Sequence, residues 1–400
     1  MPSLLIAGGG VGALSAALVV RRAGWSVQLF EQAQAFSEVG AGLQLGPNAT
    51  RLLQAWGLGS ALEAVAAFPD AVVARRISDG RELGRLPLGA QAVQRYGAPY
   101  ATLHRRDLHG LLLEGLQELE GVELQLGCKV LAFEESAERV SLIGERGCLA
   151  EGHGLIGADG LWSRVREFLL QDQRAQPTGH LAYRALIPRA DLPRLFQSNV
   201  VTVWLGPHQH AVTYPIRGGD ALNLVLIVRG QSPPFLQTWD DVVLVDEARR
   251  AVWQSCSALQ DCVAAAPAWG RWSLCDRPPV DSPSEMARGR VALLGDAAHP
   301  MRPFLAQGAA MSIEDAAELG RVLKDLRSPG SDLPSALSVY AQQRWQRVAQ
   351  VQARSRRNGK IFHAVGPIRR ARDLALRFAG SRLMDLPWLY GYGQSSVTRP

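Results

Sequence analysis

The 400-residue sequence predicts an α/β protein: a Rossmann-like dinucleotide-binding domain, an inserted antiparallel β-sheet domain of α+β character, and a helical C-terminus. Three observations indicate this class. Residues 4–31 have the pattern of a strand, a glycine turn, a helix and a second strand. Two further strand–loop–helix segments occupy 154–166 and 291–315. Between them, from about residue 177, apolar residues alternate with polar ones, as in antiparallel strands.

The opening segment carries a glycine fingerprint for a dinucleotide. Gly8, Gly10 and Ala13 match the pattern G-x-G-x-x-A, and Gly12 is an additional glycine. The helix that follows would direct its N-terminal N–H groups at a pyrophosphate. Glu31 lies 23 residues after Gly8, where such folds place the carboxylate that binds the adenosine ribose. The stretch does not distinguish NAD from FAD, and an ordinary βαβ corner is the alternative.

Composition favours a soluble, cytoplasmic protein. Charged residues make up 20% and apolar residues 47%, and no run of about 18 uncharged apolar residues occurs. The net charge of +6 comes with no nucleic-acid motif. The basic stretch from Arg344 to Arg372 is interpreted as solvated helix faces. The five cysteines form no C-x-x-C pair, so we expect no metal site.

Two later segments place charged side chains at helix starts. The segment HRRDLH opens a helix at which Arg105 would meet a phosphate-bearing ligand. A surface charge beside a capping Asp107 is the alternative. In GADGLWSRVR, Asp159 follows a buried strand, and a turn with a capped helix is again the alternative.

The third strand–loop–helix segment ends its strand at Gly295-Asp296, where an acid would accept hydrogen bonds from a sugar hydroxyl. A helix follows, and the N–H groups around Gly308, Ala309 and Ala310 would form an anion or carbonyl site at its start.

One strand of the inserted sheet carries an imidazole and a phenol. His208, His210, Val212 and Tyr214 share one face because side chains alternate along a strand. That face borders either a cavity or solvent. The pattern alone leaves both interpretations open.

Together these motifs resemble a known family, the single-component FAD-dependent aromatic hydroxylases (class A flavoprotein monooxygenases of the 4-hydroxybenzoate hydroxylase type). The resemblance covers nearly the whole chain. It rests on the glycine fingerprint, HRRDLH, GADGLWSRVR and GDAAHPMRPFLAQGAAMSIEDA, in this order. The segments GAGLQLGPNATRLL, LGPHQHAVTYPIRGG and WLYGYG are most similar to the salicylate, 3-hydroxybenzoate and 6-hydroxynicotinate hydroxylases.

The resemblance implies FAD as cofactor and NADH or NADPH as co-substrate. The cofactor-binding residues that it implies are Gly8, Gly10, Gly12, Ala13, Glu31, Arg105, Asp159, Asp296, Pro303, Gly308, Ala309 and Ala310. Asp159 belongs to the motif that serves both FAD and the nicotinamide nucleotide. Pro303 falls where many relatives keep a proline against the flavin, although the 3-hydroxybenzoate hydroxylases differ in this region.

The resemblance also implies the reaction. NAD(P)H reduces the flavin, O₂ adds to give a C4a-hydroperoxide, and oxygen passes to a small hydroxyaromatic carboxylate. His210 and Tyr214 correspond to the pair that lines the substrate site, with His210 as a base for the phenol. Arg184 and Arg302 are candidates for binding the carboxylate, and a contact with the flavin or a place on the surface is the alternative for each. His299 is expected to be structural.

The expected domains are a discontinuous FAD-binding domain, a substrate-binding sheet domain and C-terminal helices. Their ranges are 1–70, 99–176 and 275–330 for the first, 71–98 and 177–274 for the second, and 331–400 for the third. The expected partners are a small aromatic substrate and O₂, without nucleic acid or membrane, in a monomer or homodimer. A hydroxylase for a larger ring, such as a quinone or polyketide, and a flavin-binding protein without hydroxylase activity are the alternatives.

Overall fold

The computed structural model describes residues 1–36, 42–231, 241–324, 326 and 329–393. The chain divides into two compact units of three segments each. Unit 1 consists of Met1–Glu38, Leu108–Gln176 and Asp276–Ser355, and unit 2 of Val39–Asp107, Pro177–Cys275 and Arg356–Pro400. This division differs from the expected one at 39–70, at 99–107 and in the C-terminal helices. The first two residues of GAGLQLGPNATRLL lie outside the described residues.

Unit 1 contains a six-stranded sheet in the order β18-β19-β11-β1-β2-β7. Its strands are β1 (Ser3–Ala7), β2 (Ser26–Phe30), β7 (Val122–Gln125), β11 (Gly154–Gly157), β18 (Ala287–Arg288) and β19 (Val291–Leu293). All pairs are parallel except β18 with β19. Leu4, Leu5 and Ile6 have no exposed surface, because strands of a parallel sheet are covered on both faces. The predicted Rossmann-like sheet is therefore confirmed.

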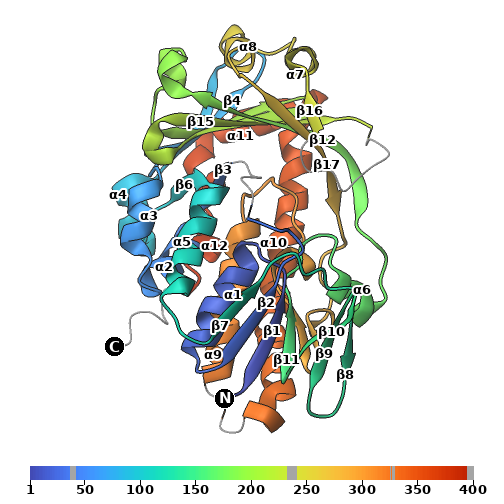
Figure 1. The fold of residues 1–400 in the computed structure, drawn as a ribbon. Helices are drawn as coiled ribbons and strands as arrows, with labels where there is room; N and C mark the ends of the chain where they lie inside the picture. The colour runs from blue at the N-terminus through green and yellow to red at the C-terminus, as the bar shows by residue number, and fades with distance from the viewer. Residues whose placement is uncertain (37–41, 232–240, 325, 327–328, 394–400) are drawn as a thin grey trace. The chain divides into compact units, whose positions relative to one another are not determined.

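Helices cover this sheet, and a second, smaller sheet follows β7 along the chain. The helices of this part are α1 (Val11–Arg22), α5 (Arg105–Gln117), α6 (Arg164–Leu170), α9 (Gly308–Lys324) and α10 (Pro329–Phe362), and the small sheet has β8 (Ala132–Glu135), β9 (Val140–Gly144) and β10 (Gly147–Gly152). Helices α1 and α9 lie side by side (Figure 1). They approach closely because Gly320 has no side chain: a β-carbon there would lie 2.8 Å from Cβ of Val19.

Unit 2 is built on an eight-stranded sheet in the order β16-β17-β12-β15-β14-β13-β4-β5. Its strands are β4 (Ala71–Arg76), β5 (Glu82–Pro87), β12 (Gln176–Pro188), β13 (Val200–Gly206), β14 (Gln209–Ile216), β15 (Ala221–Arg229), β16 (Asp241–Val243) and β17 (Trp269–Asp276). Strands β12, β15, β14 and β13 pair in antiparallel fashion, as predicted, while β13 and β4 are parallel. Strands β3 (Gly42–Leu45) and β6 (Ala101–His104) form a separate pair.

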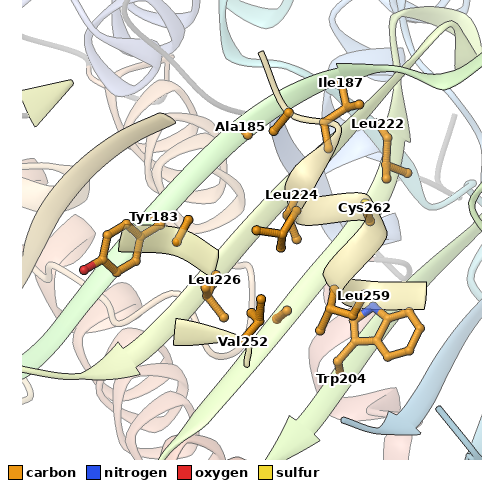
Figure 2. Close-up of a cluster of buried hydrophobic side chains, with 14 of the residues drawn as sticks. Tyr183, Ala185, Ile187, Trp204, Leu222, Leu224, Leu226, Val252, Leu259 and Cys262 are labelled. Atoms are coloured by element: carbon orange, nitrogen blue, oxygen red, sulfur yellow. The ribbon is translucent and has the colours of Figure 1, made fainter. Parts of the chain in front are cut away.

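One face of the large sheet holds a large hydrophobic core cluster of unit 2. Helices α7 (Val245–Ala251) and α8 (Ser257–Ala264) contribute side chains that pack on it. Figure 2 shows Leu224, Leu226 and Trp204 from the strands beside Leu259 and Cys262 from α8. Because alternate side chains point to opposite faces, this core leaves His210 and Tyr214 on the other face of β14.

The remaining helices of unit 2 are α2 (Pro47–Ala55), α3 (Gly59–Val65), α4 (Gly89–Tyr96), α11 (Gly366–Met384) and α12 (Pro387–Tyr390). Helix α4 lies within 71–98, a range predicted from the sequence to belong to the sheet domain. It buries Ala92 and Tyr96 one turn apart and ends at Gly97, whose φ of +72° suits a helix terminus. Short 3₁₀ turns lie at Arg189–Asp191, Arg194–Phe196, Arg217–Gly219, Pro283–Glu285 and Gly295–Ala297.

The basic stretch from Arg344 to Arg372 is only partly solvated, contrary to the expectation. Arg344 has no exposed surface and forms ion pairs with Glu314 and Asp315. Arg372 is buried against Asp373. Within the described residues, helices fall short of the length and apolarity that a membrane span requires.

Candidate functional site

The turn after β1 has a shape that only glycine permits at position 8. Gly8 has a φ of +106°, and its N–H donates to the carbonyl of Phe30 at 2.8 Å. A β-carbon on Gly8 would lie 2.4 Å from the carbonyl oxygen of Ala158. Both the torsion angle and this close approach exclude a side chain. The turn therefore passes directly against the loop that follows β11.

Helix α1 starts at this turn, with Gly10 as its N-cap and without a capping side chain among the described residues. Its first backbone bond joins Leu14 N to Gly10 O at 3.0 Å, so the N–H groups of residues 11–13 point out of the helix start. A β-carbon on Gly10 would have no described atom within 4 Å. This open and electropositive helix start fits the pyrophosphate of a dinucleotide.

Gly12 and Ala13 serve packing. A β-carbon on Gly12 would lie 2.9 Å from Cδ2 of Leu294 and 3.4 Å from Cβ of Ser312, and Ala13 has no exposed surface. These small residues bring the start of α1 next to the end of β19 and the first turn of α9.

Asp296 lies close to the start of α9. It belongs to the 3₁₀ turn after β19, and a β-carbon on Gly308 would lie 3.9 Å from its Oδ1. Helix α9 begins at Gly308, so the N–H groups of its first residues point out of the helix. Ala309 is partly exposed and Ala310 is buried. The structure thus brings Asp296 together with the helix start that the sequence predicted.

Glu31 follows β2 and lies beside the glycine turn. Its Oε1 accepts a hydrogen bond from Ala33 N at 2.8 Å. A β-carbon on Gly9 would lie 2.9 Å from its Oε2. A partly exposed carboxylate in this position suits a ribose hydroxyl.

Asp159 caps helix α6. Its carboxylate accepts hydrogen bonds from Ser163 Oγ at 2.5 Å, from Arg164 N at 2.8 Å and from Val165 N at 3.2 Å. Burial raises the pKa of Asp159, and these hydrogen bonds oppose the rise. The capped helix that the sequence left as an alternative is therefore present. A contact of Asp159 with a nucleotide stays a prediction.

Two supporting side chains in unit 1 were not predicted from the sequence. His109 Nε2 lies 2.8 Å from the carbonyl oxygen of Gly9, and its ring packs on Phe36 with 4.6 Å between centroids. Arg166 is buried and donates from Nη1 to the carbonyl oxygens of residues 297 and 298 at 3.2 and 2.6 Å. Both lie inside recognised motifs, yet only the fold shows which backbone atoms they contact.

Arg105 and Pro303 are both exposed. Arg105 is the first residue of α5 and belongs to unit 2, whereas the other predicted cofactor residues belong to unit 1. Their contacts with a flavin stay predictions.

The loop after β19 is held by a buried ionic network. Asp315 of α9 accepts hydrogen bonds from Gly295 N at 3.0 Å, from His299 Nε2 at 2.5 Å and from Arg344 Nε at 2.7 Å. Arg344 also donates to Glu314 at 2.9 Å. Burial raises the pKa of Asp315, but the charges of His299 and Arg344 and the hydrogen bonds bring it to about 2. His299 is therefore structural, as expected.

In unit 2, three predicted side chains share the face of the sheet opposite the hydrophobic core. His210 and Tyr214 lie four residues apart on β14. Val212 between them pairs with Val225 of β15, which in turn pairs with Arg184 of β12. Arg184 therefore lies two strands away from the midpoint of the pair, about 10 Å across the sheet.

His210 is fully buried beside the end of α10. Its Nδ1 lies 2.8 Å from Nε2 of His363, and its ring packs against Phe362 with 5.3 Å between centroids. Burial lowers the pKa of His210 well below its usual range, and the neighbouring His363 and His180 lower it further.

Tyr214 lies in a different polar environment at the other end of the strand. Burial raises the pKa of its phenol, and hydrogen bonds with the side chains of Gln44 and Asn223 oppose this rise. Asn223 Oδ1 accepts a hydrogen bond from Gly42 N at 2.7 Å, and Gln44 Oε1 accepts one from Tyr100 Oη at 2.7 Å. Strand β3 thus supplies one of these partners, Gln44, and β15 supplies the other, Asn223.

The two candidates for binding a carboxylate differ in their surroundings. The guanidinium of Arg184 lies over the ring of Trp272 at 5.3 Å. Arg302 already forms an ion pair with Asp276 at 2.7 Å. Among the described residues, no group of three or more His, Cys, Asp or Glu side chains is arranged to hold a metal ion.

The glycine turn, the open helix start and the carboxylate after β2 define a Rossmann-type dinucleotide-binding protein. The family described as "FAD binding domain" matches residues 2–355. The chain is 39% identical to 3-hydroxybenzoate 6-hydroxylase of Polaromonas naphthalenivorans, over 97% of this chain and 96% of the relative. It is 35% identical to 6-hydroxynicotinate 3-monooxygenase of Bordetella bronchiseptica, over 89% and 91%.

A solved structure has the same fold. The Klebsiella pneumoniae protein HpxO in complex with FAD and uric acid superposes with a TM-score of 0.84 at 25% identity, over 96% of this chain and 95% of that one. The chain belongs to the FAD binding domain family, and within it to the FAD-dependent aromatic-ring monooxygenases. FAD is therefore the dinucleotide whose ADP half the start of α1 fits.

Proposed function

We propose that the protein uses NAD(P)H and O₂ to hydroxylate a small hydroxyaromatic carboxylate of the hydroxybenzoate or hydroxynicotinate type. The observation that carries this proposal is the placing of His210, Tyr214 and Arg184 on one face of the sheet in unit 2. Together they offer a base, a phenol and a cation, which match a phenolic substrate with a carboxylate. The names of the relatives agree with this substrate class.

Each of the three side chains has a distinct proposed role. His210 stays a neutral imidazole because burial disfavours its charged form, so it accepts the phenol proton of the substrate. Tyr214 keeps its own proton for the same reason and donates a hydrogen bond to the ring substituent. Arg184 binds the carboxylate, and its stacking on Trp272 fixes the plane of the guanidinium.

Except for Arg105, the residues proposed to hold the cofactor belong to unit 1. Gly10 and residues 11–13 would hold the pyrophosphate, Glu31 the adenosine ribose, and Asp296 with the start of α9 the ribityl and isoalloxazine end. FAD, when bound and reduced by NAD(P)H, supplies the activated oxygen. The roles of Arg105, Asp159 and Pro303 toward FAD or the nicotinamide nucleotide are part of this proposal.

Replacing His210 by Ala tests the role of the base. We expect product formation to fall by about 10²-fold or more, because the substrate phenol loses its proton acceptor. Flavin reduction by NAD(P)H should change little, so NAD(P)H would be oxidised without matching product. Liquid chromatography of product, run beside NAD(P)H absorbance, measures the ratio. Wild-type coupling in the variant would show that His210 is not the base.

A further inference from the structure

His363 is placed by the backbone at the end of α10. It directly follows the helix, and its N–H donates to the carbonyl of Gly359 at 3.1 Å. Its own carbonyl accepts a hydrogen bond from His208 N at 3.3 Å. Arg372 donates to the carbonyl of Phe362 at 2.8 Å. These bonds fix the backbone on both sides of His363, so its ring meets His210 in a defined geometry.

The contact between the two imidazoles controls which nitrogen of His210 carries a proton. At 2.8 Å, one of the two nitrogens donates and the other accepts. If His210 Nδ1 donates to His363 Nε2, then His210 Nε2 has a lone pair and acts as a base. If His363 Nε2 donates, then a neutral His210 carries its proton on Nε2 and cannot accept another there.

We propose that His363 is a positioning residue for His210 that holds it in the base tautomer and passes the substrate's proton away from the buried site. This inference deepens the proposed function and rests on it. The hydrogen bond between the two rings and the burial of His210 carry it.

The proton transfers balance without a charged His210 at the end. The substrate O–H breaks as a bond to His210 Nε2 forms, and the proton on His210 Nδ1 moves to His363 Nε2. The proton on His363 Nδ1 then leaves for solvent. The substrate becomes a phenolate, and both imidazoles end neutral in the opposite tautomer. This path avoids a lasting imidazolium at a site where burial disfavours one.

The proton can leave His363 for solvent. His363 is partly exposed, and its ring lies 5.2 Å from the ring of His180, which is also partly exposed. The groups that face His363 are His180 from β12, His208 from the turn before β14 and Arg372 from α11. Burial and these groups lower the pKa of His363 to about 3, so it releases the proton instead of storing it.

The test replaces His363 by Phe, which keeps a ring, and by Gln, which keeps a hydrogen bond. Neither side chain readily accepts a proton on one atom while it releases a proton from another. His153→Gln is the matched control, because His153 is a partly exposed histidine of unit 1 and is not among the groups that face His363. Each flavin-loaded protein is mixed with 3-hydroxybenzoate. If the wild type does not hydroxylate this acid, salicylate or 6-hydroxynicotinate takes its place, whichever the wild type hydroxylates. Stopped-flow absorbance follows phenolate formation without NAD(P)H, and product is measured in turnover.

We expect both His363 variants to form phenolate and product at least about tenfold more slowly, with unchanged flavin reduction. A ring-fluorinated substrate, whose phenol is more acidic, should restore most of the rate, and so should higher pH. His153→Gln should match the wild type. The phenolate rate of the wild type should depend non-linearly on the fraction of D₂O, because two protons move.

Wild-type phenolate formation in either His363 variant would overturn the proposal. An equal loss of rate with the ring-fluorinated and the unfluorinated substrate would also overturn it, since a purely structural defect would not depend on the acidity of the phenol. A linear D₂O dependence in the wild type would contradict the relay even if neither variant folds. A wild type that hydroxylates none of these acids would instead refute the proposed function.

Discussion

At the scale of single residues, two glycines of the first turn have different roles, one in the fold and the other in the proposed cofactor site. Gly8 is required by its φ of +106° and by the contact with Ala158, whereas a β-carbon on Gly10 has open space in the protein alone. That space is where a pyrophosphate would approach the helix start. A side chain at Gly8 is therefore expected to lower the stability of the fold, whereas a side chain at Gly10 is expected to weaken FAD binding.

We predict that Gly8→Ala lowers the stability of the protein even without FAD, by about 1–3 kcal/mol for the backbone strain alone. Gly10→Ala should leave the thermal unfolding temperature of the flavin-free protein within about 2 °C of wild type. It should nevertheless weaken FAD binding at least about tenfold, as measured by fluorescence quenching on titration with FAD. Unchanged FAD affinity in Gly10→Ala would show that the ligand does not approach this helix start.

The sequence was sufficient to predict residues whose partners lie nearby in the chain. Period-two alternation placed His210 and Tyr214 on one face of a strand, and the glycine spacing placed the turn at Gly8. The contact of His210 with His363 spans 153 residues. Local patterns carry no information on such a pair, so only the fold revealed it.

At the scale of elements, α9 organises the proposed flavin end of the cofactor site. Its start faces Asp296, and about two turns further along Asp315 anchors the loop after β19 through Gly295 and His299. Arg344 of α10 completes the network. A buried carboxylate with this many partners is costly to disrupt, because each partner would lose a hydrogen-bond acceptor in a buried position.

The pKa of Asp315, about 2 in the folded protein against 3.8 for an unperturbed Asp, predicts a pH dependence. The lowered pKa contributes about 2 kcal/mol of stability above pH 4, which is lost as the pH falls from about 4 to about 2. Asp315→Asn lacks this contribution. The difference in unfolding free energy between wild type and variant should therefore be large at pH 7 and smaller near pH 3, measured by urea denaturation.

Glu318→Gln on the same helix is the matched control. Within the described residues, the carboxylate of Glu318 forms its ion pair with the half-exposed Arg321. Loss of this partly exposed pair should lower the free energy of unfolding by less than about 1 kcal/mol. A gap between wild type and Asp315→Asn that stays constant between pH 7 and pH 3 would contradict the assigned network.

Element prediction was most successful where periodicity and glycine turns agreed. The parallel strands, the antiparallel strands of 200–229 and the helix after residue 308 follow the sequence patterns closely. Helix α4 was missed because its burial depends on Ala92 and Tyr96 only, too few positions to show a helical period. The sequence predicts a solvated Arg344 because it does not reveal the buried acidic partners, which lie on another helix about 30 residues earlier.

At the scale of the whole chain, both units are assembled from segments distant in sequence. The glycine turn, the Asp159 loop and the Asp296 loop converge in unit 1 because β1, β11 and β19 are neighbours in one parallel sheet. Ligand sites in such sheets form at the carboxyl ends of the strands. The order of motifs identified the family, but the division into units depends on packing that no local motif encodes.

The proposed activity of this chain is the hydroxylation of small hydroxyaromatic carboxylates. The most direct measurement is product formation by the FAD-loaded protein with NADH or NADPH and O₂, for 3-hydroxybenzoate, salicylate, 6-hydroxynicotinate and uric acid. The phenol that lacks the carboxylate serves as control for each benzoate. We predict a hydroxylated product from at least one of the three aromatic acids, with the matching phenol turned over far less efficiently because Arg184 has no carboxylate to bind. Turnover of uric acid alone, or NAD(P)H consumption without hydroxylated product from any acid, would contradict the claim.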